Sequence, residues 1–315
     1  MNTKDVLRIM LYPAVLVKRQ LSASYVKSLI GGGKIKELAD YQYRTRLGKR
    51  MNWNNPQTLN EKIQWLKFNS DTSQWSMLSD KYRVREYIHD KGLDHILVGL
   101  YGSWTDANDI DWGKLPNRFV MKVNNGSGDV LVCTDKNKID KEIVTKKYNE
   151  LLTLKFWELF AEPHYSKIQP CIIAEELLDC NKQSIPSTTL IDYKVWCFGG
   201  KPEFIWACYN RTPEKVEVGC YDLDWQYHEE WSVFTSHYAK ASKLLPKPQN
   251  LKQLIEYAAI LSNGFPEVRV DFYEVDGKVY FGEMTFTAKG GYIDFYSDDL
   301  QLKLGSKIIL PKSMK

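Results

Sequence analysis

Two carboxylates and an arginine lie close together in one stretch near the end of the sequence, RVDFYEVDGKVYFGEMTFTAKGG, residues 269–291. Strand-forming residues flank an Asp-Gly pair at 276–277, which predicts a β-hairpin because both turn positions tolerate positive φ. Alternation places Arg269 and Asp271 on one face of the first strand, and pairing across the turn brings Asp271 near Glu283. Two adjacent acids favour a cation between them, and oxygen ligands suit Mg²⁺. A solvated hairpin face with ordinary charges is the alternative.

A glycine-containing loop supplies a second candidate site. The loop NNGSGD, residues 124–129, lies between the short predicted strands 119–123 and 130–133. Backbone N–H groups of such a loop can approach a phosphate closely, and Lys122 stands just before it. The loop is not a Walker A loop, because no Gly-Lys-Ser/Thr follows. An ordinary hairpin turn is the alternative.

Other charged residues lie at the ends of predicted elements. Lys81 falls at the start of a helix predicted from about Ser79 to Gly92, and a pair of glutamates ends the buried strand predicted over 171–178. Another strand, predicted over 193–198, follows Asp192 and carries Lys194. Taken singly, each of these charges also fits an ordinary solvated surface.

Local signals place the remaining elements. Thr58 and Glu61 form a capping box that opens a helix. Apolar periodicity predicts helices over 137–162 and 251–261, and strand patterns appear at 96–101 and 204–209. We expect a charged connector over 34–50 and an irregular insertion over 211–247, of the kind that often shapes a substrate site.

Composition limits the class of protein. The 315 residues are 43% hydrophobic and 26% charged, as in soluble globular proteins. A net charge of +4 with no nucleic-acid-binding motif does not favour nucleic acid as a partner. The six cysteines have neither zinc-site nor redox-pair spacing, which favours reduced thiols in the cytoplasm over a structural disulfide.

The N-terminal segment leaves two interpretations open. Residues 1–20 mix apolar runs with four basic residues, and the charge-free run 9–17 is broken by Pro13. This run is far shorter than the roughly 20 residues that a membrane-spanning helix needs. The segment is either a helix packed on the body of the protein or a basic amphipathic anchor at an anionic membrane surface.

The order of these candidates along the chain resembles that of the ATP-grasp superfamily of carboxylate–amine ligases. The motifs SDKYRVREYI and FVMKVNNGSGD look like the family's Asp-Lys helix and its lysine strand with glycine loop. The stretch from Arg269 to Gly291 resembles the family's Arg-x-Asp … Glu-x-Asn metal hairpin. More narrowly, PQTLNEKIQWLK, LPNRFVMKVNNGSGD, DYKVWCFGGKPEF and GEMTFTAKGG look like the TupA-like ATP-grasp group, which is associated with bacterial surface polysaccharide and teichuronopeptide biosynthesis.

The resemblance implies an α+β, ATP-grasp fold: two α+β subdomains clasping ATP, preceded by an N-terminal helical or α/β region. We expect four parts: a basic, amphipathic segment and connector at 1–50, the N-terminal helical or α/β region at 51–118, a lid subdomain at 119–180, and a C-terminal subdomain with the metal hairpin at 181–315.

The resemblance also implies a role for each site residue. The nucleotide ATP would be bound by Lys81, Lys122, Asn124, Gly126, Ser127, Gly128, Glu175, Glu176, Asp192 and Lys194. The metal Mg²⁺ would be bound by Asp271, Glu283 and Thr285, and the catalytic residues would be Arg269, Lys194 and Gly290. Thr285 departs from the family pattern, which has asparagine there, and this puts a second metal position in doubt.

The implied function is an ATP- and Mg²⁺-dependent ligase acting through an acyl-phosphate. It would join an amino acid or other amine to a carboxylate, such as a uronic acid, of a bacterial cell-surface polysaccharide or its precursor. The implied location is the cytoplasm, with peripheral contact at the inner face of the cytoplasmic membrane as a further option. One alternative is a glycosyltransferase or other nucleotide-sugar-dependent enzyme, for which the Asp-x-Asp spelling at 222–224 is a weak signal. A non-catalytic binding module is the other.

Overall fold

The computed structural model describes residues 24–126, 128–158 and 160–312. Contacts within the chain divide it into two units. The first holds the described residues up to Leu38 together with 76–86 and 98–178, and the second holds 39–75, 87–97 and the described residues from Asp179 onward. The four-part division expected from the sequence stays a prediction, and the expectations for residues 1–20 lie outside the described residues.

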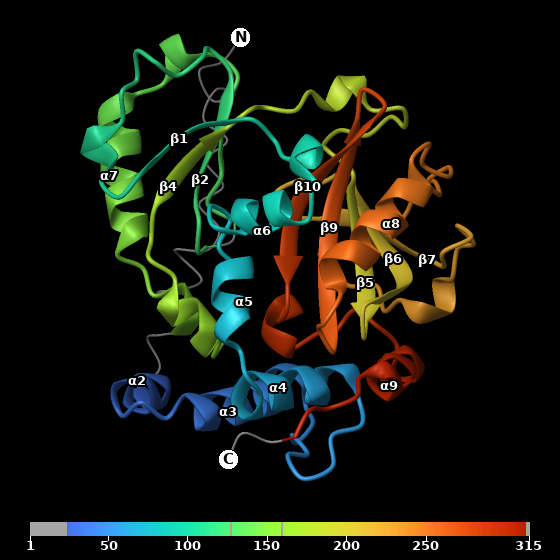
Figure 1. Cartoon of the computed structure of the whole chain (residues 1–315). Coiled ribbons are helices and arrows are strands. Elements are labelled where there is room, and N and C mark those ends of the chain that lie inside the picture. The colour runs from blue at the N-terminus through green and yellow to red at the C-terminus, as the bar shows by residue number, and fades with distance from the viewer. Residues whose placement is uncertain (1–23, 127, 159, 313–315) are drawn as a thin grey trace. The chain divides into compact units, whose positions relative to one another are not determined.

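The first unit is built on a four-stranded antiparallel sheet (Figure 1). Its order is β1-β4-β2-β3, with β1 at Leu100–Trp104, β2 at Phe119–Val123, β3 at Leu131–Cys133 and β4 at Ile172–Glu175. Helix α7 (Lys141–Leu152) contributes Val144, Tyr148 and Leu151 to the same core cluster as the sheet. Alternation along β2 sends Phe119, Met121 and Val123 into that core. Lys122 therefore lies on the opposite face.

The second unit is built on a six-stranded sheet of order β10-β9-β5-β6-β7-β8. The strands are β5 (Asp192–Phe198), β6 (Lys201–Tyr209), β7 (Val216–Tyr221), β8 (Tyr238–Lys240), β9 (Glu267–Val275) and β10 (Lys278–Thr285). All neighbouring pairs are antiparallel except β7 and β8. Helix α8 (Leu251–Ser262) packs on β5, β6 and β9. Cys197 of β5 contacts α8, so strand alternation places Asp192 and Lys194 of β5, and with them Arg269 and Asp271 of β9, on the opposite face.

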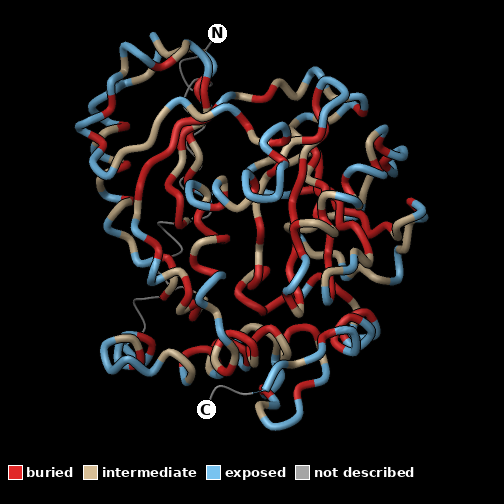
Figure 2. The backbone as a smooth tube through the Cα atoms, in the orientation of Figure 1, coloured by how far each residue is buried: buried red, intermediate tan, exposed pale blue. Residues whose placement is uncertain are grey.

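The remaining elements are short or lie outside the sheets. The α-helices are α2 (Ser24–Gly31), α3 (Ile35–Leu47), α4 (Leu59–Asn69), α5 (Ser73–Leu78), α6 (Val84–Asp90) and α9 (Asp298–Lys307). The 3₁₀ segments are Asp94–Ile96, Ala107–Asp109, Lys136–Lys138, Phe156–Glu158, Pro163–Lys167, Cys180–Lys182, Glu229–Trp231 and Ala288–Gly291. Figure 2 shows that much of the strand backbone in each sheet is buried. None of the described helices is both long and apolar enough to cross a membrane.

Several local predictions are confirmed. The hairpin of β9 and β10 turns at Asp276 and Gly277, both of which have positive φ. Thr58 and Glu61 form the expected capping box of α4, and Gly92 has the positive φ typical of a residue that ends a helix. These features depend on residues close in sequence, which is why the sequence alone could locate them.

Other boundaries differ from the expectation for identifiable reasons. The helix expected from Ser79 begins only at Val84, because the Asp80 carboxylate accepts hydrogen bonds from the backbone of Tyr82 and Arg83 and holds a turn there. The connector expected over 34–50 contains helix α3, and the helix expected over 137–162 is restricted to α7. The strand expected over 96–101 is shifted to β1. The insertion 211–247 is not irregular throughout, since it contains β7 and β8.

Candidate functional site

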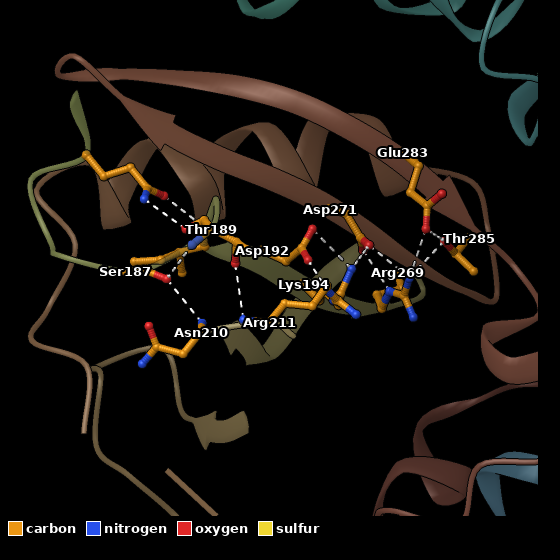
Figure 3. A network of polar contacts seen from close by, with 12 residues as sticks. Ser187, Thr189, Asp192, Lys194, Asn210, Arg211, Arg269, Asp271, Glu283 and Thr285 are labelled. Atoms are coloured by element: carbon orange, nitrogen blue, oxygen red, sulfur yellow. Dashed lines mark hydrogen bonds and ion pairs between the residues drawn. The ribbon is translucent and has the colours of Figure 1, made fainter. Parts of the chain in front are cut away.

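The second unit gathers a continuous network of polar residues on the face of its sheet opposite α8 (Figure 3). Its register places Asp271 opposite Glu283 on one side and opposite Lys194 on the other, and Arg269 lies opposite Thr285. The predicted approach of Asp271 and Glu283 is therefore confirmed. A β-bulge interrupts the ladder between Phe281 and Glu283, beside Gly282.

Asp271 is held by two cations. Arg269 Nε lies 2.7 Å from Asp271 Oδ1, and Arg269 Nη2 lies 2.8 Å from Oδ2. Lys194 Nζ also donates to Oδ2. The Asp271 side chain is only 2% exposed, so this carboxylate has exchanged water for a guanidinium and an ammonium group.

Glu283 and Thr285 complete one end of the network. Arg269 Nη2 donates to Glu283 Oε1 and to Thr285 Oγ1, both at 3.1 Å. The Thr285 hydroxyl in turn donates to Glu283 Oε1 at 2.9 Å. Because the Glu283 side chain is 38% exposed, the network meets solvent at this end.

Asp192 and Arg211 extend the network in the other direction. Asp192 Oδ1 lies 3.5 Å from Lys194 Nζ, and its Oδ2 accepts a hydrogen bond from Arg211 Nη2 at 3.2 Å. The sequence did not single out Arg211, which opens the insertion 211–247. The only feature of the sequence that could have indicated Arg211 was the expected pairing of the strands at 193–198 and 204–209. This pairing brings the residues after Tyr209 back beside Asp192.

Burial and neighbouring charge act against each other in this network. Burial raises the pKa of Asp271 above its ordinary value, although the positive charges of Arg269 and Lys194 oppose this shift. Burial lowers the pKa values of Arg269 and Lys194, but the neighbouring carboxylates outweigh it and both values are raised. Both bases therefore stay positively charged across the physiological pH range.

The donor set at β9 and β10 fits Mg²⁺ in its chemistry. Asp271 and Glu283 offer carboxylate oxygens from directly opposed positions, and Thr285 adds a hydroxyl oxygen. Arg269 and Lys194 bond both carboxylate oxygens of Asp271, so Mg²⁺ can bind this carboxylate only if one of these two side chains moves away from it. Across the described residues, no group of three or more His, Cys, Asp or Glu side chains could by itself hold a metal. The site therefore needs further oxygen ligands, as phosphate and water would supply.

Gly290 lies in a left-handed turn just beyond β10. Lys289, Gly290 and Gly291 have φ values of 50°, 68° and 77°. For a residue with a side chain, such as Lys289, this conformation costs about 1–2 kcal/mol. The Lys289 ammonium bonds Asp294 and lies 5.6 Å from the centroids of the Tyr238 and Phe295 rings.

In the first unit, a separate group of predicted residues lies on the open face of the sheet. Lys122 Nζ lies 2.6 Å from Glu175 Oε2, and Arg85 Nη1 lies 3.6 Å from Glu175 Oε1. Both side chains of the Lys122–Glu175 pair are partly exposed, at 22% and 10%. Glu176 follows β4, and its backbone N–H donates to the carbonyl of Gly99.

Lys81 forms two hydrogen bonds with the glycine loop. Its Nζ donates to the carbonyl of Gly126 at 2.7 Å, and its backbone N–H donates to the carbonyl of Asn124. The loop therefore stands beside Lys81, while the nucleotide-binding role of both stays a prediction. Gly128 has a φ of 92°, a backbone conformation that favours glycine. Ser127 lies outside the described residues.

Asn124 holds the loop in place through its own side chain. Its amide nitrogen donates to Asp80 Oδ1 at 2.9 Å and to the carbonyl of Gln169 at 3.0 Å. Its amide oxygen accepts from the backbone N–H of Cys171 at 2.8 Å. The side chain is fully buried, which makes Asn124 a support of the loop. Its predicted contact with a nucleotide stays a prediction.

The predicted site residues thus form two groups, one within each unit. The Asp-x-Asp sequence at 222–224 belongs to neither. Asp222 Oδ1 accepts hydrogen bonds from the backbone of Asp224 and Gln226 and so closes a turn after β7. Nothing in this turn favours a nucleotide-sugar site.

Comparisons with known proteins identify the class and then the family. A model of the TupA-like ATP-grasp family matches residues 61–309. The chain is an ATP-grasp protein, and its two units of mixed helices and strands agree with the α+β fold expected of that class. It belongs to the TupA-like ATP-grasp family.

Solved structures of ATP-grasp ligases are similar at low sequence identity. The D-alanine–D-alanine ligase from Bacillus anthracis is 16% identical, with a TM-score of 0.40 over 69% of this chain and 59% of that one. The enzyme from Helicobacter pylori is 14% identical, with a TM-score of 0.41 over 82% and 68%. The ATP-grasp ligase PsnB, complexed with a precursor peptide and AMPPNP, is 13% identical, with a TM-score of 0.39 over 90% and 71%. This chain spans less than two thirds of the Bacillus anthracis ligase, and no curated protein matches it.

Proposed function

We propose that the protein is an ATP- and Mg²⁺-dependent carboxylate–amine ligase that acts through an acyl-phosphate. The observation that carries the proposal is the opposed pair Asp271 and Glu283, with Arg269 and Lys194 bonded to the same carboxylate. The stability of the fold does not require so many buried charges on one sheet face, because well-packed apolar residues in their place often give equal or greater stability. Phosphoryl transfer does require them, because it depends on positioning and on neutralising negative charge.

In the proposed reaction, an oxygen of the substrate carboxylate attacks the γ-phosphorus of ATP and ADP leaves. The amine nitrogen then attacks the acyl carbon, phosphate leaves, and the nitrogen loses a proton to give the amide. Asp271, Glu283 and Thr285 would hold Mg²⁺, which supplies positive charge to the phosphate oxygens when bound. Lys194 would contact the γ-phosphate, and Arg269 would steady the negative charge of the attacking carboxylate.

The first unit would hold the rest of the nucleotide. Lys122 and Glu175 form an ion pair on the open face of its sheet. We propose that Lys122 turns to the phosphates and that Glu175 and Glu176 hold the adenosine. Lys81 and the loop 124–129 would cover the phosphates, and their hydrogen bond at Gly126 supports a common role.

The substrates follow from the family resemblance. We propose that the carboxylate belongs to a uronic acid of a bacterial surface polysaccharide or its precursor, and that the amine is an amino acid or a related compound. Such precursors are made in the cytoplasm, which is where we place the protein. A contact of the N-terminal segment with the inner face of the membrane belongs to the same proposal.

The test is ADP formation from Mg²⁺–ATP in the presence of a panel of uronic acids and amino acids. Asp271→Asn and Glu283→Gln are each expected to lower the rate by at least about a hundredfold. Asp276→Asn is the matched control, because this acid lies in the turn of the same hairpin, outside the network. Full turnover in both site variants, or a protein stabilised by uridine nucleotides instead of adenine nucleotides, would overturn the proposal.

A further inference from the structure

Helix α4 carries a polar stripe that the proposed chemistry does not use. Asn60, Gln64 and Lys67 recur at intervals of four and three residues, so they share one face of the helix. All three are buried, with Gln64 0% and Lys67 3% exposed. Buried amide and ammonium groups are uncommon and need hydrogen-bond partners.

Gln64 and Lys67 bond the main chain of the turn that follows β10. Gln64 Nε2 donates to the carbonyl of Gly290 at 2.9 Å and to that of Gly291 at 3.1 Å. Lys67 Nζ donates to the same Gly290 carbonyl at 2.9 Å. One carbonyl oxygen therefore accepts from both an amide and a charged group.

Asn60 continues the contact along the chain. Its side-chain nitrogen donates to the carbonyl of Ile293 at 2.7 Å, and its oxygen accepts from the backbone N–H of Ile293 at 2.9 Å. The stripe on α4 thus follows the main chain from Gly290 to Ile293. A contact made only of apolar side chains would leave the peptide planes free to rotate, whereas these hydrogen bonds fix them.

The turn also fits closely against the helix. A Cβ atom added to Gly291 would lie 2.9 Å from Gln64 Nε2 and 2.9 Å from Ile63 Cγ2, and its φ is in the left-handed region. Glycine is therefore required at Gly291 for both backbone conformation and space. Unfavourable backbone conformations persist where surrounding contacts hold them, and they cluster at functional sites.

The turn is joined to the charged network by a short, buried spacer. Thr285, which bonds Arg269 and Glu283, precedes Lys289 by four residues. Of the three residues between them, Phe286 and Ala288 are 0% exposed and Thr287 is 2% exposed. A displacement of the turn would therefore be transmitted to the end of β10.

We propose that Gln64 and Lys67 are positioning residues for the ligase reaction, acting by fixing the peptide between Gly290 and Gly291. Because the carbonyl and N–H of a trans peptide point in opposite directions, fixing the Gly290 carbonyl also fixes the Gly291 N–H. This inference rests on the proposed function and on the catalytic role that the family resemblance implies for Gly290.

The variants Gln64→Met and Lys67→Met remove the donor. Methionine matches the length of glutamine and is one atom shorter than lysine. Lys62→Met is the matched control, because Lys62 lies on the same helix and its Nζ donates to another carbonyl, that of Ile308, at 2.8 Å. Lys67→Arg retains a charged donor and serves as the conservative variant if Lys67→Met does not fold.

Two measurements on the full-length protein separate this inference from the proposed function. The first is backbone hydrogen exchange of residues 286–293. We expect Lys67→Met and Gln64→Met to accelerate it at least tenfold, Lys67→Arg to accelerate it less, and Lys62→Met to leave it unchanged. Unchanged exchange in the first two variants overturns the positioning role, whether or not turnover is measurable.

The second measurement is the rate of ADP formation with the panel of uronic acids and amino acids. We expect Lys67→Met to lower kcat at least tenfold with the KM for ATP within about twofold, and Lys62→Met to leave both within twofold. Equal kcat values for these two variants overturn the positioning role. Loss of adenine-nucleotide binding by the wild-type protein would instead count against the proposed function and leave the exchange result standing.

Discussion

Arg269 and Asp271 lie two residues apart on β9 and are joined at two points, with Nε 2.7 Å from Oδ1 and Nη2 2.8 Å from Oδ2. Residues i and i+2 share a face of a strand, which permits this contact. The paired geometry matches the guanidinium fork to both carboxylate oxygens. A lysine in place of Arg269 could make only a single-point contact with this carboxylate.

The pair should be strongly coupled in stability. Arg269→Met leaves the buried Asp271 carboxylate with Lys194 alone, and we expect it to lower the free energy of unfolding by about 3 kcal/mol. Asp271→Asn should destabilise less, because Arg269 keeps Glu283 as a partner. Urea denaturation of both single variants and the double variant should give a coupling energy above about 1 kcal/mol. Purely additive losses would show that the two side chains are not coupled in stability.

Thr285 tests the metal assignment. Thr285→Val removes the hydroxyl that accepts from Arg269 and donates to Glu283, which should cost about 1 kcal/mol of stability. If the hydroxyl oxygen also binds Mg²⁺, the Mg²⁺ concentration giving half-maximal ADP formation should rise about threefold to tenfold, by the usual conversion of roughly 1.4 kcal/mol per factor of ten. Thr285→Ser and Thr285→Asn, which retain an oxygen, should stay near the wild-type value. An unchanged Mg²⁺ dependence in Thr285→Val would remove this residue from the metal site.

The cysteines should differ sharply in reactivity. All six are free thiols, five of them buried, and Cys180 alone is partly exposed. Burial raises the pKa values of Cys171, Cys197, Cys208 and Cys220 to about 12. Since the thiolate is the reactive form, we expect one equivalent of an aromatic disulfide reagent to react rapidly with the native protein and six equivalents after denaturation. Cys180→Ser should abolish the rapid phase, and a rapid phase that survives would show that a buried thiol is accessible.

The parts of the site that the sequence predicted depend on short-range patterns. The pairing of Asp271 with Glu283 follows from strand alternation and the Asp-Gly turn, and Lys122 falls within the short strand predicted over 119–123. Family resemblance added the assignment of roles, which no local pattern contains.

The parts that the sequence missed depend on contacts between distant residues. Gln64 and Lys67 bond a carbonyl more than 220 positions further along the chain. A sequence does not distinguish a buried amide or ammonium group from an exposed one. The only features that the sequence indicated for α4 were therefore a capping box and an apolar face. Arg211 was missed similarly, because its partner Asp192 lies on a neighbouring strand.

Glu267 is the residue for which we expect most clearly that ionisation changes the stability of the protein with pH. It opens β9, is 0% exposed, and among the described residues neither carboxyl oxygen has a hydrogen-bond partner. Burial raises its pKa well above the ordinary 4.5, and the positive charge of Arg269 opposes this only in part. The buried thiol of Cys197 is another titratable group that interacts electrostatically with Glu267.

The sign of the effect follows from proton binding. Above pH 4.5 the unfolded chain loses the Glu267 proton while the folded protein retains it. The stability of the wild type should therefore fall as pH rises from 4.5 to the raised pKa of the folded state, by up to about 1.4 kcal/mol per pH unit. Glu267→Gln does not ionise, so its stability relative to the wild type should increase through this window.

The measurement is urea denaturation of the wild type and Glu267→Gln from pH 5 to pH 9, compared as a difference at each pH. Glu274→Gln is the control on the same strand, because the Glu274 carboxylate accepts hydrogen bonds from Ser184 Oγ and from the backbone N–H of Asn250, both at 2.7 Å. Its substitution removes an acceptor and should destabilise the protein. If the difference between the wild type and Glu267→Gln does not change with pH, the buried carboxyl is ionised in the folded protein, and a compensating charge must lie closer to it than Arg269.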